Sequence, residues 1–157
     1  MPAFLSLSRG REPSRARAQC NHLTVLHKWF TFRANRDEGD LMNLAFVYLP
    51  VRDLSEAVGF YRDTLGLKEA WREGDHTAAF AVNGSDVQLM VGVPGDDDER
   101  AVGPLFIVDD VNDFVARQRD SLRLRFAPRE IPPGLLAGFE DPAGNLLRVM
   151  DVSKERT

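Results

Sequence analysis

An internal repeat is the feature that most constrains the fold of this chain. The segment Val51–Val58 (VRDLSEAV) matches Val108–Val115 (VDDVNDFV), with three of eight positions identical and three more similar. Each copy follows an apolar run and contains an Asp that has an acidic residue three positions later. This spacing resembles a capping box and predicts the start of a helix. The sequence therefore predicts a strand–helix unit that occurs twice.

Both predicted helices carry an apolar stripe of helical period. The first is expected over Asp53–Leu65 and ends at Gly66, because glycine tolerates the left-handed conformation at a helix C-terminus. The second is expected over Asp110–Ser121. In both helices apolar residues recur every three or four positions, so each helix should bury one face.

Strand-like runs precede and follow each helix, separated by turn-forming residues. The expected strands are Leu44–Val51, Leu67–Arg72, Thr77–Val82 and Asp86–Val91 in the first copy, and Leu105–Val108, Leu124–Arg129, Gly134–Phe139 and Asn145–Val152 in the second. The order β-α-β-β-β, found twice, predicts an α+β fold. We expect two βαβββ modules, about residues 43–92 and 102–152, within one domain of residues 42–157.

Short motifs at both ends of this region point to a known family. Leu49-Pro50-Val51-Arg52-Asp53-Leu54 is followed by Phe60-Tyr61 and Leu65-Gly66-Leu67, and the second copy ends with Phe139-Glu140-Asp141-Pro142-Ala143-Gly144-Asn145. In this order and spacing the motifs resemble the glyoxalase / bleomycin-resistance / extradiol-dioxygenase superfamily, also called vicinal oxygen chelate. The resemblance implies that the two modules form a curled mixed sheet around a shared cleft.

The resemblance also implies where a metal would bind. In the metalloenzymes of this superfamily, four cleft-facing strand positions supply His, Glu or Gln to a divalent metal. The corresponding residues here are Phe46, Gln88, Gly103 and Arg148. Only Gln88 offers a ligand, because Phe and Gly have no side-chain donor atom and Arg is a cation without an acceptor. We therefore expect no metal, no cofactor and no catalytic residue at these positions; His76 is expected in an exposed turn.

Strand alternation indicates which side chains line the cleft. The expected ligand-binding residues are Phe46, Tyr48, Trp71, Gln88, Met90 and Arg148. An aromatic surface with few polar groups is typical of a small-molecule site. The aromatic and methionine side chains could equally fill the core. A buried Arg148 needs an acceptor, which would be Asp86, Glu140 or an anionic ligand.

Three functions follow from these observations. The first is a metal-free protein of the bleomycin-resistance kind that binds a small, partly aromatic organic molecule. The second is a lyase, an isomerase or a ring-cleaving dioxygenase, as the resemblance implies. The third is an interaction module whose cleft is closed by side chains. The resemblance also implies a homodimer.

Residues 1–41 lack the repeat and differ in charge from the rest. They carry seven Lys or Arg against four Asp or Glu, although the whole chain has a net charge of −4. The remaining domain is therefore acidic, which argues against a nucleic-acid partner. Their composition predicts a flexible N-terminal extension or a natural start at Met42, with a docked element or a targeting peptide as alternatives.

Composition also bears on the compartment. The single cysteine, Cys20, excludes an internal disulfide, so we expect a cytoplasmic protein. No apolar run reaches the roughly 18 residues of a membrane span, and we expect no membrane partner. The acidic run Asp96–Glu99 is expected to be a solvated linker between the modules.

Overall fold

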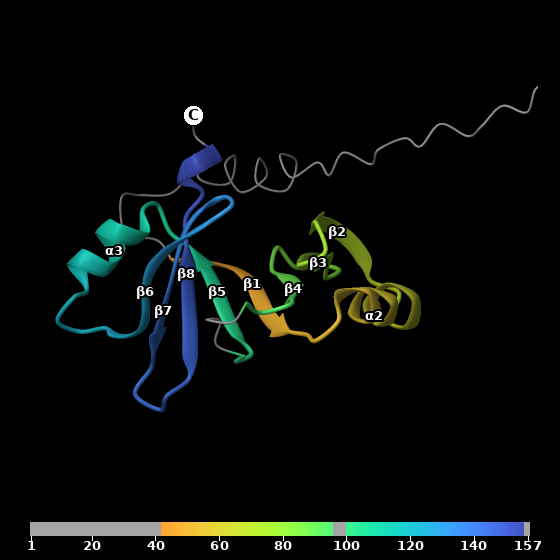
Figure 1. Cartoon of the computed structure of the whole chain (residues 1–157), viewed down its shortest axis with the longest axis horizontal. Coiled ribbons are helices and arrows are strands. Elements are labelled where there is room, and N and C mark those ends of the chain that lie inside the picture. Colours follow the sequence, from red (N-terminus) through yellow and green to blue (C-terminus); the bar gives the residue numbers. More distant parts are fainter. Residues whose placement is uncertain (1–41, 96–99, 156–157) are drawn as a thin grey trace, which may run out of the picture.

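The structure is a computed structural model that describes residues 42–95 and 100–155, and these residues build one eight-stranded mixed sheet (Figure 1). The predictions for residues 1–41 and Asp96–Glu99 lie outside the described residues. The first module comprises β1 (Asn43–Pro50), α2 (Leu54–Gly59), the π-helix η2 (Phe60–Thr64), β2 (Lys68–Glu73), β3 (Thr77–Ala81) and β4 (Gln88–Gly92). The second comprises β5 (Gly103–Ile107), α3 (Val111–Arg117), β6 (Arg123–Ile131), β7 (Gly134–Glu140), β8 (Leu146–Met150) and the 3-10 helix η3 (Ser153–Glu155).

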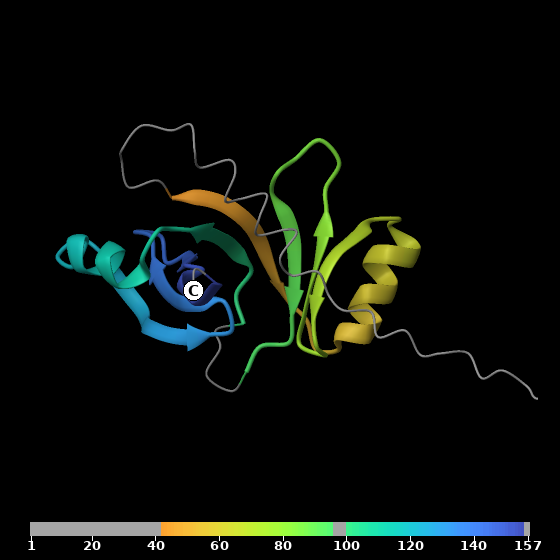
Figure 2. The same ribbon diagram turned by 90° about the horizontal axis from the view of Figure 1, so that it is seen from above.

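The strand order shows the repeat directly. The sheet runs β2-β3-β4-β1-β5-β8-β7-β6, so each half contains one module. The first strand of each module pairs in parallel with its last strand, β1 with β4 and β5 with β8. The halves join through the antiparallel pair β1–β5. Figure 2 shows the curl of the sheet and α2 and α3 at its opposite ends. The prediction of two βαβββ modules in a curled mixed sheet is confirmed.

Both helices begin where the capping pattern predicts. The Asp53 carboxylate accepts a hydrogen bond from the Glu56 amide at 2.8 Å, and Asp110 accepts one from the Asp113 amide at 2.9 Å. Such caps satisfy backbone donors that the first helical turn leaves without partners. The first helix spans its predicted length, although its final turn is π-helical. The second helix was predicted too long, because α3 ends at Arg117 and a turn follows it.

Three apolar clusters divide the core between the two faces of the sheet. Two of them lie under the helices: α2 packs on Ala78, Phe80 and Val91, and α3 packs on Ala137, Phe139 and Val149. The third cluster lies on the opposite face. Its buried members are Ala45, Phe46, Ala79, Met90, Leu105, Met150 and Val152. Because this third cluster draws on both modules, it ties them together across the β1–β5 pair.

A buried carboxylate fastens the end of β8 to its surroundings. Asp151 is 1% exposed and accepts hydrogen bonds from the amides of Val111, Leu135 and Ser153, and from the Ser153 hydroxyl at 2.7 Å. Burial alone would raise the pKa of Asp151, but the hydrogen bonds from Ser153, Val111 and Leu135 together lower it below its ordinary value. Gly134 makes room for this carboxylate, since a Cβ there would lie 2.2 Å from Asp151 Oδ1. One charged group therefore links α3, β7, β8 and η3.

Candidate functional site

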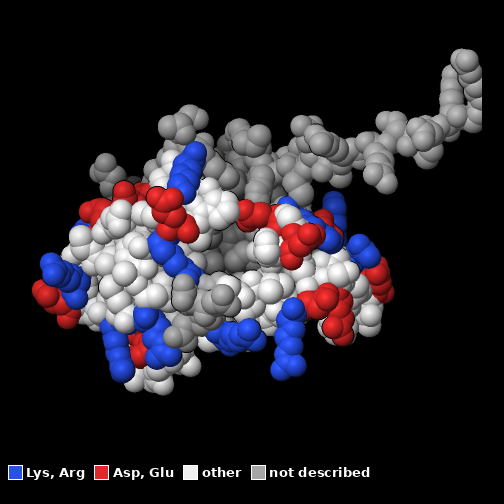
Figure 3. All heavy atoms as spheres, viewed as in Figure 1, with Lys and Arg blue, Asp and Glu red and all other residues white. Residues whose placement is uncertain are grey.

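The candidate site lies on the concave face of the sheet, opposite the helices. Strand register places three of the positions expected to line the cleft, Phe46, Gln88 and Arg148, in one row across the sheet. Phe46 on β1 lies beside Gln88 on β4 and Leu105 on β5, and Leu105 lies beside Arg148 on β8. Figure 3 shows a recess between the described atoms of the two modules, which meet below it. Residues from both halves of the sheet therefore share one surface.

The first module supplies the aromatic part of this surface. The Trp71 indole N–H donates to Gln88 Oε1 at 3.1 Å, and the Phe46 ring meets the Trp71 ring edge-on at a centroid distance of 5.9 Å. Phe46 and Met90 are buried and form a floor, whereas Trp71 and Gln88 are half-buried. Trp71 thus holds one side of the Gln88 amide, whose NH₂ group can donate to a ligand.

Tyr48 stands at the boundary between the modules. Its hydroxyl donates a long hydrogen bond, 3.4 Å, to the Gly92 carbonyl. The ring lies against Gly92, where a Cβ would come within 2.9 Å of Tyr48 Cε2. The Arg148 guanidinium lies over the ring, 4.7 Å from its centroid. Burial raises the pKa of Tyr48, and the positive charges of Arg148 and Arg129 oppose this rise. Both arginines therefore act electrostatically on the Tyr48 hydroxyl.

Arg148 is buried at 4% exposure, and its Nη2 donates to the Ala101 carbonyl at 3.0 Å. The prediction that Asp86 or Glu140 neutralises it is wrong. Glu140 instead binds Arg125 at 2.6 Å and Arg123 at 3.1 Å.

The reason is the strand register. Arg123 lies directly opposite Glu140 in the β6–β7 ladder, so β6 rather than β8 supplies the partners of this carboxylate. Asp86 precedes β4 and is exposed to solvent. An exposed carboxylate is well hydrated and gains little from an ion pair.

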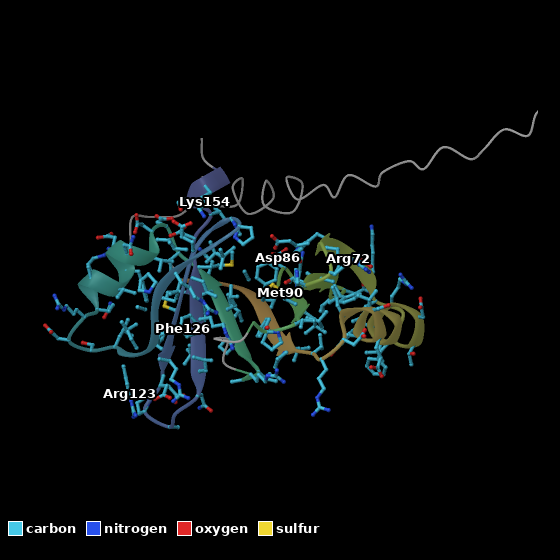
Figure 4. All side chains as sticks on the ribbon, viewed as in Figure 1. Arg72, Asp86, Met90, Arg123, Phe126 and Lys154 are labelled. Atoms are coloured by element: carbon cyan, nitrogen blue, oxygen red, sulfur yellow. The ribbon has the colours of Figure 1, made fainter. Side chains whose placement is uncertain are left out.

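Two residues of the site were not predicted from the sequence: Phe126 and Arg129 on β6. The Phe126 ring lies across Gly138, where a Cβ would be 2.2 Å from a ring carbon. The Arg129 guanidinium lies over this ring, 4.6 Å from its centroid. Figure 4 labels Phe126 together with Met90 from the other module.

Simple alternation would place Phe126 and Arg129 on opposite faces of β6. The ladder is irregular between them, and Arg129 pairs with Leu136, a residue packed against the concave-face cluster. Such an irregularity re-aims side chains. The proline at position 128 was the available signal, because proline interrupts a regular strand ladder.

The four positions that hold a metal in related metalloenzymes do not fit one here. Phe46 and Arg148 offer no ligand atom, and the Gln88 oxygen accepts from Trp71. Gly103 cannot carry a side chain in this backbone, since its Cβ would lie 2.3 Å from the Leu146 carbonyl oxygen. Within residues 42–95 and 100–155, no three His, Cys, Asp or Glu side chains form a group that could hold a metal ion. His76 is exposed in its turn, as predicted.

Two βαβββ modules in one curled sheet, with the site on the concave face, define the glyoxalase-like class of folds. A sequence profile of the Glyoxalase/Bleomycin resistance protein/Dioxygenase superfamily matches residues 43–149, and the chain belongs to that superfamily. A comparison with curated proteins found no match. In the described part of the chain, no helix combines the length and the apolar character of a membrane span.

Solved structures show the same fold at low sequence identity. Methylmalonyl-CoA epimerase from Mycobacterium tuberculosis is 24% identical, with a TM-score of 0.54, over 74% of this chain and 93% of that one. The Streptomyces coelicolor epimerase in complex with 2-nitronate-propionyl-CoA is 21% identical, with a TM-score of 0.57, over 72% and 99%. A structure described as NAD-dependent benzaldehyde dehydrogenase from Legionella pneumophila is 17% identical, with a TM-score of 0.59, over 68% and 97%. These values support a common fold.

Proposed function

We propose that this protein binds a small, partly aromatic organic molecule on the concave face of its sheet, without a metal ion. The observation that carries the proposal is the cluster of half-buried Trp71, Tyr48 and Gln88 above the buried Phe46 and Met90. Flat aromatic side chains with a few fixed polar groups suit a flat organic ligand. A homodimer and a cytoplasmic location stay predictions.

A metal-dependent lyase, isomerase or dioxygenase is the second candidate, supported by superfamily membership. It requires ligands that Phe46, Gly103 and Arg148 do not provide. An interaction module without a ligand is the third candidate, supported by the close packing of the concave-face cluster. A thermal-shift screen and a metal analysis separate these candidates.

Ligand binding is expected to raise the melting temperature. A compound that binds only the folded state stabilises it in proportion to the logarithm of its concentration above Kd. A thermal-shift screen of bicyclic aromatic compounds, both neutral and charged, should therefore give hits. Trp71→Ala should weaken those hits by about tenfold, because an aromatic contact contributes about 0.5–1.5 kcal/mol beyond its buried area.

Phe60→Ala is the matched control, since Phe60 is 50% exposed and contacts Tyr61, whose ring stacks on Phe80 in the cluster under α2. It should leave the affinities unchanged. A screen without a single stabilising compound would favour the interaction module and refute ligand binding.

Metal analysis provides the second test. Protein purified without chelators should contain well under one equivalent of Ni, Zn, Fe or Mn, because the donor set is incomplete. One tightly bound metal per chain, lost in Gln88→Ala, would refute the metal-free proposal and favour the enzymes.

A further inference from the structure

The convex face of the sheet, which carries the helices, is covered unevenly. α2 packs mainly on β3 and β4, and α3 packs mainly on β7, whereas the central strands β1 and β5 lie between these two regions. Figure 2 shows the two helices at opposite ends of the sheet. No helix in the described part of the chain therefore makes its main contacts with the central β1–β5 pair.

Apolar side chains occupy this central part of the convex face. We call four of them the junction strip: Leu44, Val47, Leu89 and Pro104. Val47 lies beside both Leu89 and Pro104, so these three form a row across β4, β1 and β5. Leu89 pairs with Phe80 under α2, and Leu44 pairs with Phe106 at the cluster under α3. Since paired residues of neighbouring strands share a face, the junction strip lies on the helix side.

The junction strip is apolar but is not part of the core that the described residues form. None of its four members belongs to one of the three core clusters of residues 42–95 and 100–155. Leu44 is 38% exposed, and the other three side chains are half-buried. The apolar face of a sheet is normally buried against another layer, and a contiguous apolar surface left in water indicates an interface.

The chain itself contains a segment of matching character. Six of the ten residues Leu23–Phe32 (LTVLHKWFTF) are apolar, and three of the six are aromatic. Such a segment gains free energy when it leaves water. Residues 1–41 also carry more basic than acidic side chains, whereas the rest of the chain is acidic, so the two parts attract each other.

The position of this segment along the chain favours it over a second copy as the occupant. Nine residues, 33–41, connect it to Met42, which packs against the cluster under α3 and lies two residues before Leu44. Nine residues span up to about 30 Å, and the whole strip lies within roughly 20 Å of Met42 along and across the strands. A short tether gives an effective concentration in the millimolar range, which exceeds that of a second copy in dilute solution.

We propose that residues 23–32 dock on the junction strip of their own chain and cover the convex face between α2 and α3. This is the docked element that the sequence left open as one alternative for residues 1–41. The docked segment contacts both modules, through Leu89 in the first and Pro104 in the second, and so stabilises their junction from the side opposite the concave face. The inference concerns a different face from the candidate site and is independent of the proposed function.

A spin label on Cys20 tests the docking in the full-length protein. Cys20 is the only cysteine of the chain and lies three residues before Leu23, so a nitroxide can be attached there without any substitution. The nitroxide broadens the amide NMR signals of nearby residues. We expect the amide signals of Val47 and Leu89 to lose most of their intensity, and that of Ala137, which lies under α3, to lose much less. A segment that does not dock would affect Ala137 at least as strongly, because Met42 packs against the same cluster as Ala137.

A mixed sample identifies the chain that supplies the segment. Chains labelled with ¹⁵N but without the nitroxide are mixed with unlabelled chains that carry it. Docking within one chain predicts that the broadening of Val47 and Leu89 disappears in this mixture. Broadening that persists would show that a second copy covers the strip, and equal or absent broadening of Leu89 and Ala137 in the first sample would show that no docking occurs. Each of these two results overturns the proposal.

Tryptophan fluorescence gives a second, independent measurement. The chain has two tryptophans, so the Trp71→Phe variant reports Trp29 alone. We expect Trp29 to emit at the short wavelength of a buried indole and to shift to longer wavelength in Leu44→Lys, which places a cation on the strip opposite a basic segment. Leu65→Lys is the matched control, because Leu65 is 51% exposed beside η2 and should give no shift. Trp29 emission typical of an exposed indole in the Trp71→Phe protein, or equal emission with and without Leu44→Lys, would contradict the docking.

Discussion

Replacing Asp151 by alanine is expected to lower the free energy of unfolding by about 3–5 kcal/mol. The carboxylate is 1% exposed and accepts four hydrogen bonds from Val111, Leu135 and Ser153. Its removal leaves buried amide donors without acceptors, which costs more than the loss of an exposed group. A loss of this size is a large part of the roughly 5–15 kcal/mol that stabilises a domain.

Urea or thermal unfolding of the variant measures this effect. Asp120→Ala is the matched control, because Asp120 is exposed in the turn after α3, and its change should stay within about 0.5 kcal/mol. Asp151→Asn should lie between wild type and Asp151→Ala, since an amide oxygen can replace part of the acceptor. If Asp151→Ala unfolded at the same denaturant concentration as wild type, the fastening role of this carboxylate would be disproved.

The same carboxylate gives stability a pH dependence of known sign. Its pKa in the folded protein lies below the value of about 3.9 of an unfolded chain. The folded state therefore binds fewer protons than the unfolded state in this range. The stability that the ionised Asp151 carboxylate contributes is fully present above about pH 4 and is lost as the pH falls through the pKa of the folded protein. Asp151→Asn should remove this component, so its stability should fall less than that of wild type on acidification.

The second large effect is expected at Gly103. Gly103→Ala should destabilise the fold by about 3 kcal/mol or more, because a Cβ there would lie 2.3 Å from the Leu146 carbonyl oxygen, and a backbone atom cannot rotate away. Gly59→Ala provides a control of opposite sign. Gly59 lies at the end of α2, and a Cβ there would meet only Asp63 Oδ2, at an ordinary contact distance of 4.0 Å, so alanine should stabilise the helix by about 0.5–1 kcal/mol.

This comparison bears on function as well as stability. Gly103 occupies one of the four positions that carry metal ligands in related metalloenzymes. If the expected loss is measured, a ligand at this position requires a different spacing of β5 and β8. A fully stable Gly103→Ala protein would show that the strands can move apart and that this position can accept a side chain.

The sequence was sufficient for the fold because the repeat, the caps and the turn residues agree. Asp53 and Asp110 cap their helices as predicted, and alternation placed Phe46, Tyr48 and Met90 on the concave face. These features depend on neighbours along the chain or on a strand period of two. Local rules therefore predict them.

The rest of the site depends on how the strands pair with one another, which patterns between neighbouring residues in the sequence do not reveal. The partners of Glu140 follow from the register of β6 against β7, and Arg129 reaches the concave face because the ladder shifts between it and Phe126. A shift of one residue inverts the facing of a strand, and alternation cannot detect it. The two missed residues, Phe126 and Arg129, therefore reflect one irregularity in β6.

The antiparallel pair β1–β5 has a consequence for the dynamics of the protein. Each module closes its own ladders and has its own cluster under its own helix, whereas the concave-face cluster spans both. Local opening between the halves would thus expose the ligand surface before either helix loses its packing, as cooperative sub-global units do. A ligand that contacted both halves of the concave face would oppose that opening. Ligand binding would then be coupled to the free energy of opening between the two halves. Amide hydrogen exchange along β1 and β5 would slow as the site fills.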